Sequence, residues 1–208
     1  MSSHQSPIPT IGFLGACTPD IWSGWVAAFE QELKKLGWIK DSTVHIEYRW
    51  AEGLEKNYTK YAKEFVHNKV DVIVTGGTQC TFACKKAAAA VKPPIPVVFA
   101  TAGSPVHTKL IETFSQPGNL TGLSNQQINL AIKRLDLLRH LVGKAHIGLI
   151  GNDKSPNVKL EMKIVKQLAP MFGLKVRTGL IRQQKDIARV IRKLKGKVKG
   201  LLVCTDPL

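Results

Sequence analysis

The order of apolar and polar positions predicts strands that alternate with helices through the first part of the chain. Short apolar runs typical of buried parallel strands occupy residues 11–16, 70–75 and 97–100, and residues 44–50 are predicted to form a further strand. Between these runs, apolar residues recur every three or four positions, as on one face of a helix. These faces carry Trp22, Trp25, Val26, Phe29, Leu33 and Leu36, then Tyr58, Tyr61, Ala62 and Phe65, before an Ala-rich helix that runs to about Val91. Such alternation predicts a parallel sheet with right-handed crossovers.

The same pattern restarts in the second part of the chain. Apolar runs at residues 146–150, 174–180 and 201–204 predict three further strands. The predicted inward faces of the helices carry Leu135, Leu138, Leu141 and Val142; Val158, Met162, Val165 and Phe172; and Ile187, Val190, Ile191 and Leu194. A faint repeat, IGFLG at 11–15 against IGLIG at 147–151, adds to the prediction of two similar α/β lobes, residues 1–124 and 125–208. Because the second unit stops at its third strand, we expect a fragment or a natural truncation, unless another chain completes the sheet.

The positive charge is concentrated in the second of these parts. Of the net charge of +15, residues 1–124 carry +2 and residues 125–208 carry +13. Such an excess invites a nucleic-acid or acidic-partner interpretation through phosphate neutralisation. However, apolar residues alternate with the charges at helical period, and Phe172 is the one aromatic residue after Asn125 that could stack on a base. The sequence therefore favours a solvated polar face over a nucleic-acid surface.

The chain carries none of the common catalytic or metal-binding motifs. It lacks a phosphate-binding loop, a dinucleotide fingerprint, a nucleophile elbow and a zinc-protease helix. The histidines do not cluster at metal-ligand spacing, and the four dispersed cysteines are best interpreted as small buried apolar residues. We therefore predict no catalytic residue, no metal and no cofactor. We also predict no membrane span, and we expect a secretion leader to be absent or already removed.

Small polar residues follow five of the predicted strands. They form the segments Cys17-Thr18, Gly76-Gly77-Thr78-Gln79, Thr101-Ala102-Gly103-Ser104, Gly151-Asn152-Asp153 and Thr205-Asp206. In open parallel sheets, ligands bind beyond the carboxyl ends of the strands, where helix N-termini offer N–H groups to an anion. Taken singly, each loop is explained as an ordinary cap or turn. Taken together, the five loops favour a shared ligand site as much as they favour five ordinary caps and turns.

Seven further segments occur in a distinctive order: IGFLGACTPD, VHIEYRWAEG, VDVIVTGGT, IPVVFATAGSPV, QPGNLTGLS, KRLDLLRHLV and LLVCTDPL. Taken in this order, they resemble the substrate-binding proteins of bacterial ABC transporters, in the branch that includes tryptophan- and tyrosine-binding members. The resemblance implies a type I periplasmic-binding fold: two doubly wound α/β lobes with a ligand closed between them, the second lobe being truncated here. It further implies capture of a small solute in the periplasm or another extracytoplasmic space, without catalysis, and delivery to a membrane permease.

Position by position, the resemblance implies ligand contacts at Thr18, Thr78, Gln79, Ser104, Asn125 and Asp206. Thr78 would hold a carboxylate at the start of its helix, and Asp206 would face an ammonium group. An aromatic amino acid or related carboxylate is the implied solute. Self-association through the incomplete second lobe is a further expectation. The alternative from a different class is a ligand-sensing regulatory module or a basic nucleic-acid binder, and an enzyme using Cys17 or Cys204 is a third, less favoured one.

Overall fold

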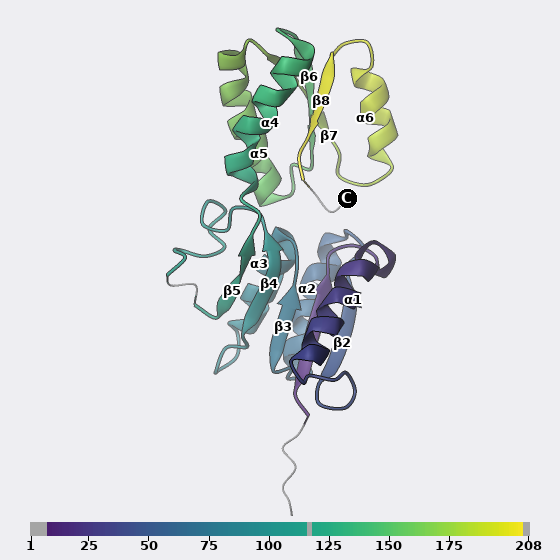
Figure 1. Ribbon diagram of the computed structural model, residues 1–208, viewed down its shortest axis with the longest axis vertical. Helices are drawn as coiled ribbons and strands as arrows, with labels where there is room; N and C mark the ends of the chain where they lie inside the picture. The colour runs from purple at the N-terminus through teal and green to yellow at the C-terminus, as the bar shows by residue number, and fades with distance from the viewer. Residues whose placement is uncertain (1–7, 116–117, 206–208) are drawn as a thin grey trace, which may run out of the picture. The chain divides into compact units, whose positions relative to one another are not determined.

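The structure, a computed structural model, describes residues 8–115 and 118–205 and separates into two compact units (Figure 1). One unit comprises Met1–Thr101 and Thr113–Leu123, and the other comprises Ala102–Glu112 and Ser124–Leu208. The chain therefore crosses between the units three times: near the ends of two strands, β4 (Val97–Ala102) and β5 (Leu120–Ser124), and between Glu112 and Thr113. The predicted lobes 1–124 and 125–208 stay a prediction about domains, because grouping by contact does not measure independent folding.

The first unit contains a five-stranded sheet in the order β2-β1-β3-β4-β5. Its first three strands are β1 (Thr10–Gly15), β2 (His45–Trp50) and β3 (Val72–Thr75). Strands β2, β1, β3 and β4 are parallel to their neighbours, and β1 lies buried between β2 and β3. All the carboxyl ends of these four strands consequently lie at one edge of the sheet, which is where the predicted polar loops begin.

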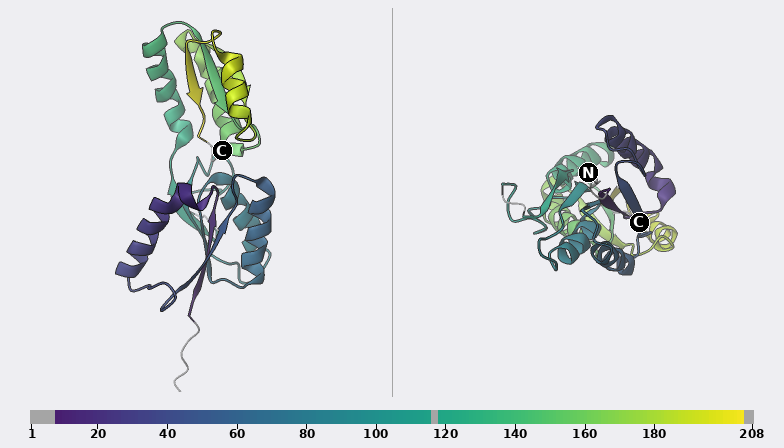
Figure 2. Two further views of the ribbon diagram at one scale, coloured as in Figure 1. Left: turned by 90° about the vertical axis from the view of Figure 1, so that its right-hand side faces the viewer. Right: turned by 90° about the horizontal axis from the view of Figure 1, so that it is seen from below.

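Three helices cover the two faces of this sheet. The helices are α1 (Pro19–Lys35), α2 (Glu55–His67) and α3 (Thr78–Ala88). The ring of Phe13 contacts Trp22 and Phe29 of α1, whereas a Cβ on the adjacent Gly12 would meet Phe65 of α2. Since neighbouring strand residues point to opposite faces, α1 lies on one face of the sheet, and α2, packed beside α3, lies on the other (Figure 2).

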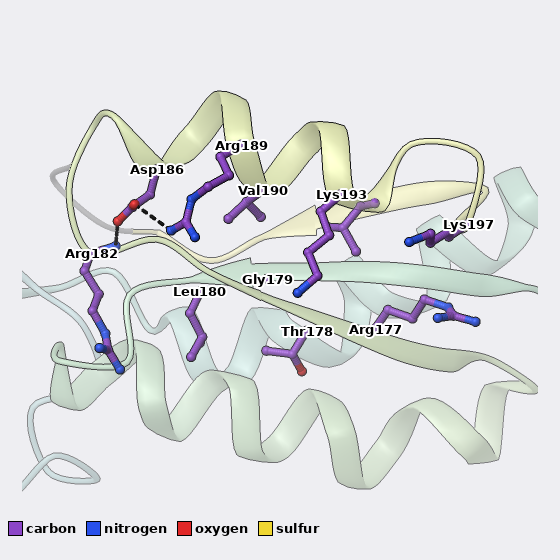
Figure 3. Close-up of a pocket in the computed structure, with 11 residues that line it drawn as sticks. Arg177, Thr178, Gly179, Leu180, Arg182, Asp186, Arg189, Val190, Lys193 and Lys197 are labelled. Atoms are coloured by element: carbon purple, nitrogen blue, oxygen red, sulfur yellow. Dashed lines mark hydrogen bonds and ion pairs between the residues drawn. The ribbon is translucent and has the colours of Figure 1, made fainter.

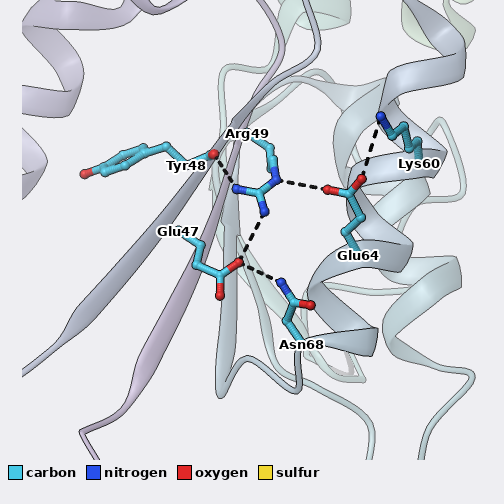
Figure 4. A network of polar contacts seen from close by, with 6 residues as sticks. All are labelled: Glu47, Tyr48, Arg49, Lys60, Glu64 and Asn68. Carbon is cyan, nitrogen blue, oxygen red and sulfur yellow. Dashed lines mark hydrogen bonds and ion pairs between the residues drawn. The ribbon is translucent and has the colours of Figure 1, made fainter.

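The strand β2 places its side chains in two different clusters. Tyr48 and Trp50 face α1, with stacked rings 6.2 Å apart, and both pack on Phe13. Glu47 and Arg49 point to the opposite face, where the Arg49 guanidinium lies 3.0 Å from Glu64 of α2 and 3.6 Å from Glu47 (Figure 4). Residues 47–50 belong to the segment VHIEYRWAEG, which resembles the substrate-binding proteins. In the structure, these residues pack β2 against the helices.

The second unit contains a three-stranded parallel sheet in the order β7-β6-β8. Its elements are α4 (Gln127–Val142), β6 (His146–Gly151), α5 (Pro156–Leu168), a 3-10 turn η1 (Ala169–Phe172), β7 (Lys175–Leu180), α6 (Asp186–Leu194) and β8 (Gly200–Val203). Ile147 and Leu149 of β6 join a core with α4 and α5, while Ile150 joins Val190 and Leu194 of α6. Figure 1 shows the resulting layers, with α6 on the opposite face from α4 and α5.

The predicted fold class is confirmed, and two parts of the prediction are corrected. Strand β5 was not predicted, because LTGLS is short and contains a glycine. Trp25, Leu36, Leu141 and Ile191 were expected to point inward, but they are 66%, 74%, 83% and 43% exposed. Trp25 and Leu36 are exposed because, among the described residues, α1 is the one helix on its face of the sheet. The apolar side of α1 is therefore wider than the surface that can cover it.

Candidate functional site

In the first unit, the starts of α1 and α3 meet at the carboxyl edge of the sheet. Thr18 precedes α1, and Gly77 precedes α3 with a φ of 89°, a conformation that favours glycine. The Gly77 N–H donates to the Thr101 carbonyl at 2.8 Å, which fixes the turn against the end of β4. A Cβ on Gly77 would lie 3.6 Å from Ala16, so the two loops are in contact.

This arrangement gives the start of α3 the character of an anion site. Thr78 is buried and Gln79 is half-buried, both in the first turn of an 11-residue helix with no acidic residue in that turn. The N–H groups of a first helical turn have no intrahelical acceptor, and the helix dipole adds a partial positive charge there. A carboxylate is the group that this geometry accommodates best.

The cysteines are packing residues. All four cysteines of the chain are buried, as expected for small apolar residues. Burial raises the pKa of the Cys84 thiol to about 12 and that of Cys80 well above its usual value. A thiol with so high a pKa is a poor nucleophile at neutral pH.

In the second unit, Ser104 caps a helix from outside that helix. The residue before α4, Gln126, has a φ of 48° and makes no capping bond to the backbone through its side chain. Instead, the Ser104 Oγ accepts a hydrogen bond from the Ile128 N–H at 3.3 Å. Ser104 is 6% exposed and has a φ of 28°, so the side chain is held in place by the segment it joins to α4.

Next to this cap, the first turns of α4 and α5 are joined by two buried amides. The Asn157 Nδ2 donates a short hydrogen bond to the Gln127 Oε1. Gly103 lies so close that a Cβ there would be 2.4 Å from the Asn157 amide, so this position requires glycine. The Asn157 Oδ1 is buried and has no hydrogen-bond partner among the described residues. Because an unpaired buried acceptor is costly, this oxygen is suited to accept a hydrogen bond from a bound donor.

One turn further along α5, a buried ion pair ties together α4, α5 and the end of β8. Glu161 is fully buried, and its carboxylate accepts from Arg134 of α4 at 2.6 Å. The Arg134 guanidinium also donates to the Val203 carbonyl of β8. Burial raises the pKa of Glu161 above its ordinary value, and the adjacent Arg134 charge opposes that rise.

The loop after β6 is held by its own polar contacts. The Asn152 Oδ1 accepts from the Lys154 N–H at 3.0 Å, so the loop bends back before α5 begins. Asp153 accepts two hydrogen bonds from Arg182, at 2.9 and 2.8 Å, which links this loop to the end of β7. These bonds hold the pKa of Asp153 below its ordinary value. Both loops therefore have fixed positions relative to each other.

The predicted site residues fall into two groups. Thr18, Thr78 and Gln79 lie at the strand ends of the first unit, and Ser104 and Asn125 lie together in the second, where the Asn125 N–H donates to the Ala102 carbonyl at 3.2 Å. Asp206 lies outside the described residues. Whether any of these residues contacts a ligand stays a prediction.

Two buried polar residues, Gln127 and Asn157, were missed. Asn157 could have been found from the sequence, because a polar residue directly before an apolar helical face marks a first helical turn. Glu161 interrupts the apolar face formed by Val158, Met162 and Val165, and a charge at such a position indicates a buried partner.

Within residues 8–115 and 118–205, no group of histidine, cysteine or acidic residues is arranged to hold a metal ion. None of the helices in the same ranges has the length and apolar character needed to cross a membrane.

Two parallel-sheet α/β units with polar strand ends are the architecture of solute-binding proteins, and comparison with known proteins gives the family. Residues 22–208 match the model of the ABC transporter substrate binding protein family, and the chain belongs to it. A "Tyrosine-binding protein" from Clostridioides difficile (strain R20291) is 27% identical over 183 residues, which are 86% of this chain and 51% of that protein.

Two crystal structures share the fold. One is an ABC domain in complex with L-Trp from Streptococcus pneumonia, with a TM-score of 0.81 and 24% identity over 95% of this chain and 65% of that one. The other is a conserved domain protein from Vibrio cholerae, with a TM-score of 0.82 and 22% identity over 93% of this chain and 64% of that one. These structures confirm the type I periplasmic-binding fold. The chain spans about half the length of its curated relative and about two thirds of these structures.

Proposed function

We propose that this protein binds a small carboxylate-bearing solute, an aromatic amino acid in the first instance, and does not act on it chemically. The observation that carries the proposal is the unpartnered Asn157 Oδ1, which is buried at the joined starts of α4 and α5 in a chain of this family. It is an acceptor suited to an ammonium group. The names of the relatives, a tyrosine-binding protein and an L-Trp complex, support an aromatic amino acid as the solute.

The first unit offers donor groups suited to a carboxylate. Thr78 and the first turn of α3 offer N–H and hydroxyl donors without a competing acidic side chain in that turn. Thr18, which precedes α1, and Gln79, in the first turn of α3, are proposed as further contacts, as are Ser104 and Asn125. Asp206 is proposed as a second acceptor for the ammonium group.

Calorimetric titration with L-Tyr and L-Trp tests the proposal, with tyramine and 3-phenylpropionate as analogues that lack one charged group each. We expect heat with the amino acids and weaker binding of both analogues. Thr78→Val should weaken binding roughly tenfold, because it removes a hydroxyl hydrogen bond to a charged group. Asn157→Leu should weaken the amino acids but spare 3-phenylpropionate, which has no ammonium group.

The matched control is Thr59→Val, which makes the same change at an exposed position on α2. It should bind as the unsubstituted chain does. Absence of heat with every amino acid and analogue, from a chain whose circular dichroism shows it to be folded, would contradict the proposal.

Delivery of the solute to a membrane permease, and a location outside the cytoplasm, are proposed on family membership. A purified permease reconstituted in vesicles provides the test, since a delivering protein should stimulate its ATPase activity only when the solute is present. Stimulation without solute, or none at all, would contradict this part of the proposal.

Self-association through the second unit is also proposed. Strand β8 is an edge of the described sheet, and the apolar groove beside it is lined by Ile187, Ile191, Leu201 and Val203. A second copy placed along β8 would cover this groove. Light scattering over a concentration series should show a dimer that Val203→Lys abolishes. A monomer at every concentration would rule the dimer out.

A further inference from the structure

The outer edge of β7 presents unpaired backbone groups that the proposed solute binding does not use. The Lys175 N–H donates to the Ala145 carbonyl at 2.9 Å and the Ile181 N–H to the Gly151 carbonyl at 3.1 Å, so these N–H groups point toward β6. Because backbone groups alternate in direction along a strand, those of Val176, Thr178 and Leu180 point away from β6. Among the described residues, no strand pairs with this edge.

A groove of about 470 Å³ runs beside this edge, with α6 forming one wall (Figure 3). Helix α6 packs tightly on β7, since a Cβ on Gly179 would lie 2.4 Å from the Val190 Cγ1. Thr178 and Leu180, whose side chains point to the other face of β7, also line the groove. A groove lined from both faces of an edge strand lies along the open side of that strand, where an additional strand would sit.

The groove is strongly positive, and its charge is only partly neutralised by acidic side chains. Arg182 and Arg189 are paired with Asp153 and Asp186. By contrast, three further cationic side chains make no ion pair or hydrogen bond with any residue in the described part of the chain: those of Arg177, Lys193 and Lys197. Figure 3 shows the Lys193 side chain extended from α6 toward β7. Residues 175–199 hold ten Lys and Arg and a single acidic residue, so the local field favours an anionic partner.

We propose that this groove binds an acidic segment of a partner protein as an extended strand added along β7. Backbone pairing would use the free groups of Val176, Thr178 and Leu180, which gives affinity without regard to sequence. Acidic side chains at every second position of the bound segment would project on the α6 side, toward Arg177 and Lys193. A second copy of this chain would bring an equally positive edge, so the charges also select against self-pairing at β7.

Fluorescence anisotropy with short labelled peptides tests this proposal directly. A peptide of alternating glutamate and threonine should bind, and its affinity should fall as salt rises. The same peptide with N-methyl groups on one backbone edge keeps its charge but cannot pair, so it should bind at least roughly tenfold more weakly. A lysine-threonine peptide should not bind.

Two protein variants separate local charge from net charge. Arg177→Gln/Lys193→Gln/Lys197→Gln should weaken the glutamate peptide roughly tenfold, because it removes three exposed charge contacts. The matched control, Lys159→Gln/Lys163→Gln/Lys166→Gln, removes the same charge from exposed positions on α5. It should change the affinity less than about twofold, since those charges lie on the opposite face of the sheet.

Thr178→Pro removes an outward N–H from the β7 edge and should weaken the peptide without affecting pairing to β6. If that variant misfolds, the N-methylated peptide makes the same test on the unchanged protein. Equal binding of the N-methylated peptide would overturn the proposal. So would stronger binding of a single-stranded RNA or of phosphatidylglycerol vesicles, which need no strand pairing. Titration of the triple glutamine variant with L-Tyr and L-Trp distinguishes a failure here from a failure of solute binding.

Discussion

Single residues at the strand ends of the first unit are packed with little room to spare. Trp22 lies between Phe13, Trp25 and Trp50, with ring centroids 5.4–6.2 Å apart. A Cβ on Gly76 would lie 2.4 Å from the Trp22 Cη2. Because the ring is held on its other sides by aromatic neighbours, it has no free direction in which to move.

We therefore expect Gly76→Ala to destabilise the protein by roughly 1–3 kcal/mol through overpacking. Urea unfolding followed by tryptophan fluorescence measures the change. Gly24→Ala provides the control, because Gly24 lies within α1 and a Cβ there would meet nothing within 4 Å. The control should stabilise by about 0.5–1 kcal/mol, since alanine is the better helix former. Equal effects of the two substitutions would contradict the packing argument.

The cysteines give a second prediction at this scale. With burial raising the pKa of Cys84 to about 12, its thiolate is scarce in the native protein near neutral pH. Ellman's reagent should therefore label Cys80 and Cys84 slowly in the native protein and at once in urea. Raising the pH within the native range should accelerate labelling less than it does for a free thiol. Rapid native labelling of Cys84, located by peptide mapping, would show that its burial is wrong.

How far the site could be predicted differs from residue to residue. Thr78 and Gln79 could be placed from Gly76-Gly77, because a glycine pair after an apolar run marks a turn into a helix. Ser104 also lies at a strand end, but its role in capping α4 depends on a contact with residue 128 that no local pattern contains. The missed Asn157 amide lies against Gly103 with its Oδ1 buried and unpaired, and this tertiary contact is contained in no local pattern.

At the scale of elements, the second unit is joined by the buried pair of Arg134 and Glu161. This pair links α4, α5 and β8, although none of the three is adjacent in sequence. A buried ion pair adds little net stability compared with apolar residues, but removal of one partner leaves an uncompensated buried charge. The pair therefore fixes how the helices meet rather than how strongly they are held.

Arg134→Met should accordingly destabilise the protein by about 3–5 kcal/mol at neutral pH. It should also make stability more dependent on pH. With the folded pKa of Glu161 raised above its ordinary value, the native state binds the extra proton, so the free energy of unfolding falls as pH rises from the unfolded to the folded pKa. Loss of the Arg134 charge raises the folded pKa further and widens that range upward. Urea unfolding at a series of pH values measures both effects.

The double variant Arg134→Met/Glu161→Met is the matched control for this prediction. It removes both charges and should recover most of the stability lost in the single variant, together with the added pH dependence. A double variant as unstable as the single one would show that packing of Arg134, and not the buried carboxylate, carries the effect.

The order of strands and helices was more predictable than which of their residues are buried. Apolar runs flanked by polar loops located strands such as β1 and β3, because a buried parallel strand has no polar face to obscure it. Strand β5 has exposed residues at Thr121, Gly122 and Leu123, so it lacks that signal. Helical periodicity indicated which side of α1 is apolar, yet it could not show that Trp25 and Leu36 remain uncovered.

For the whole molecule, the uneven charge predicts a salt dependence of stability. The second part of the chain carries +13 of the net +15, and like charges at this density repel one another in the compact state. Added sodium chloride should therefore raise the temperature of unfolding as the screening length falls to about 10 Å. Differential scanning calorimetry of the chain and of Lys159→Gln/Lys163→Gln/Lys166→Gln checks this. The variant should respond less to salt, and an equal response would contradict the repulsion argument.

The location of the aromatic residues also determines which part of this protein tryptophan fluorescence can follow. All four tryptophans, at 22, 25, 38 and 50, and all three tyrosines belong to the first unit, while Phe172 is the one aromatic residue of the second sheet and its helices. Selective excitation of tryptophan thus follows the first unit alone, whereas circular dichroism in the far ultraviolet follows both. Denaturation curves from the two signals should separate wherever the units unfold independently. The second unit, which holds Asn157 and the basic groove, has no tryptophan and needs a fluorescent reporter of its own. Leu141→Trp would provide one at a position that is 83% exposed.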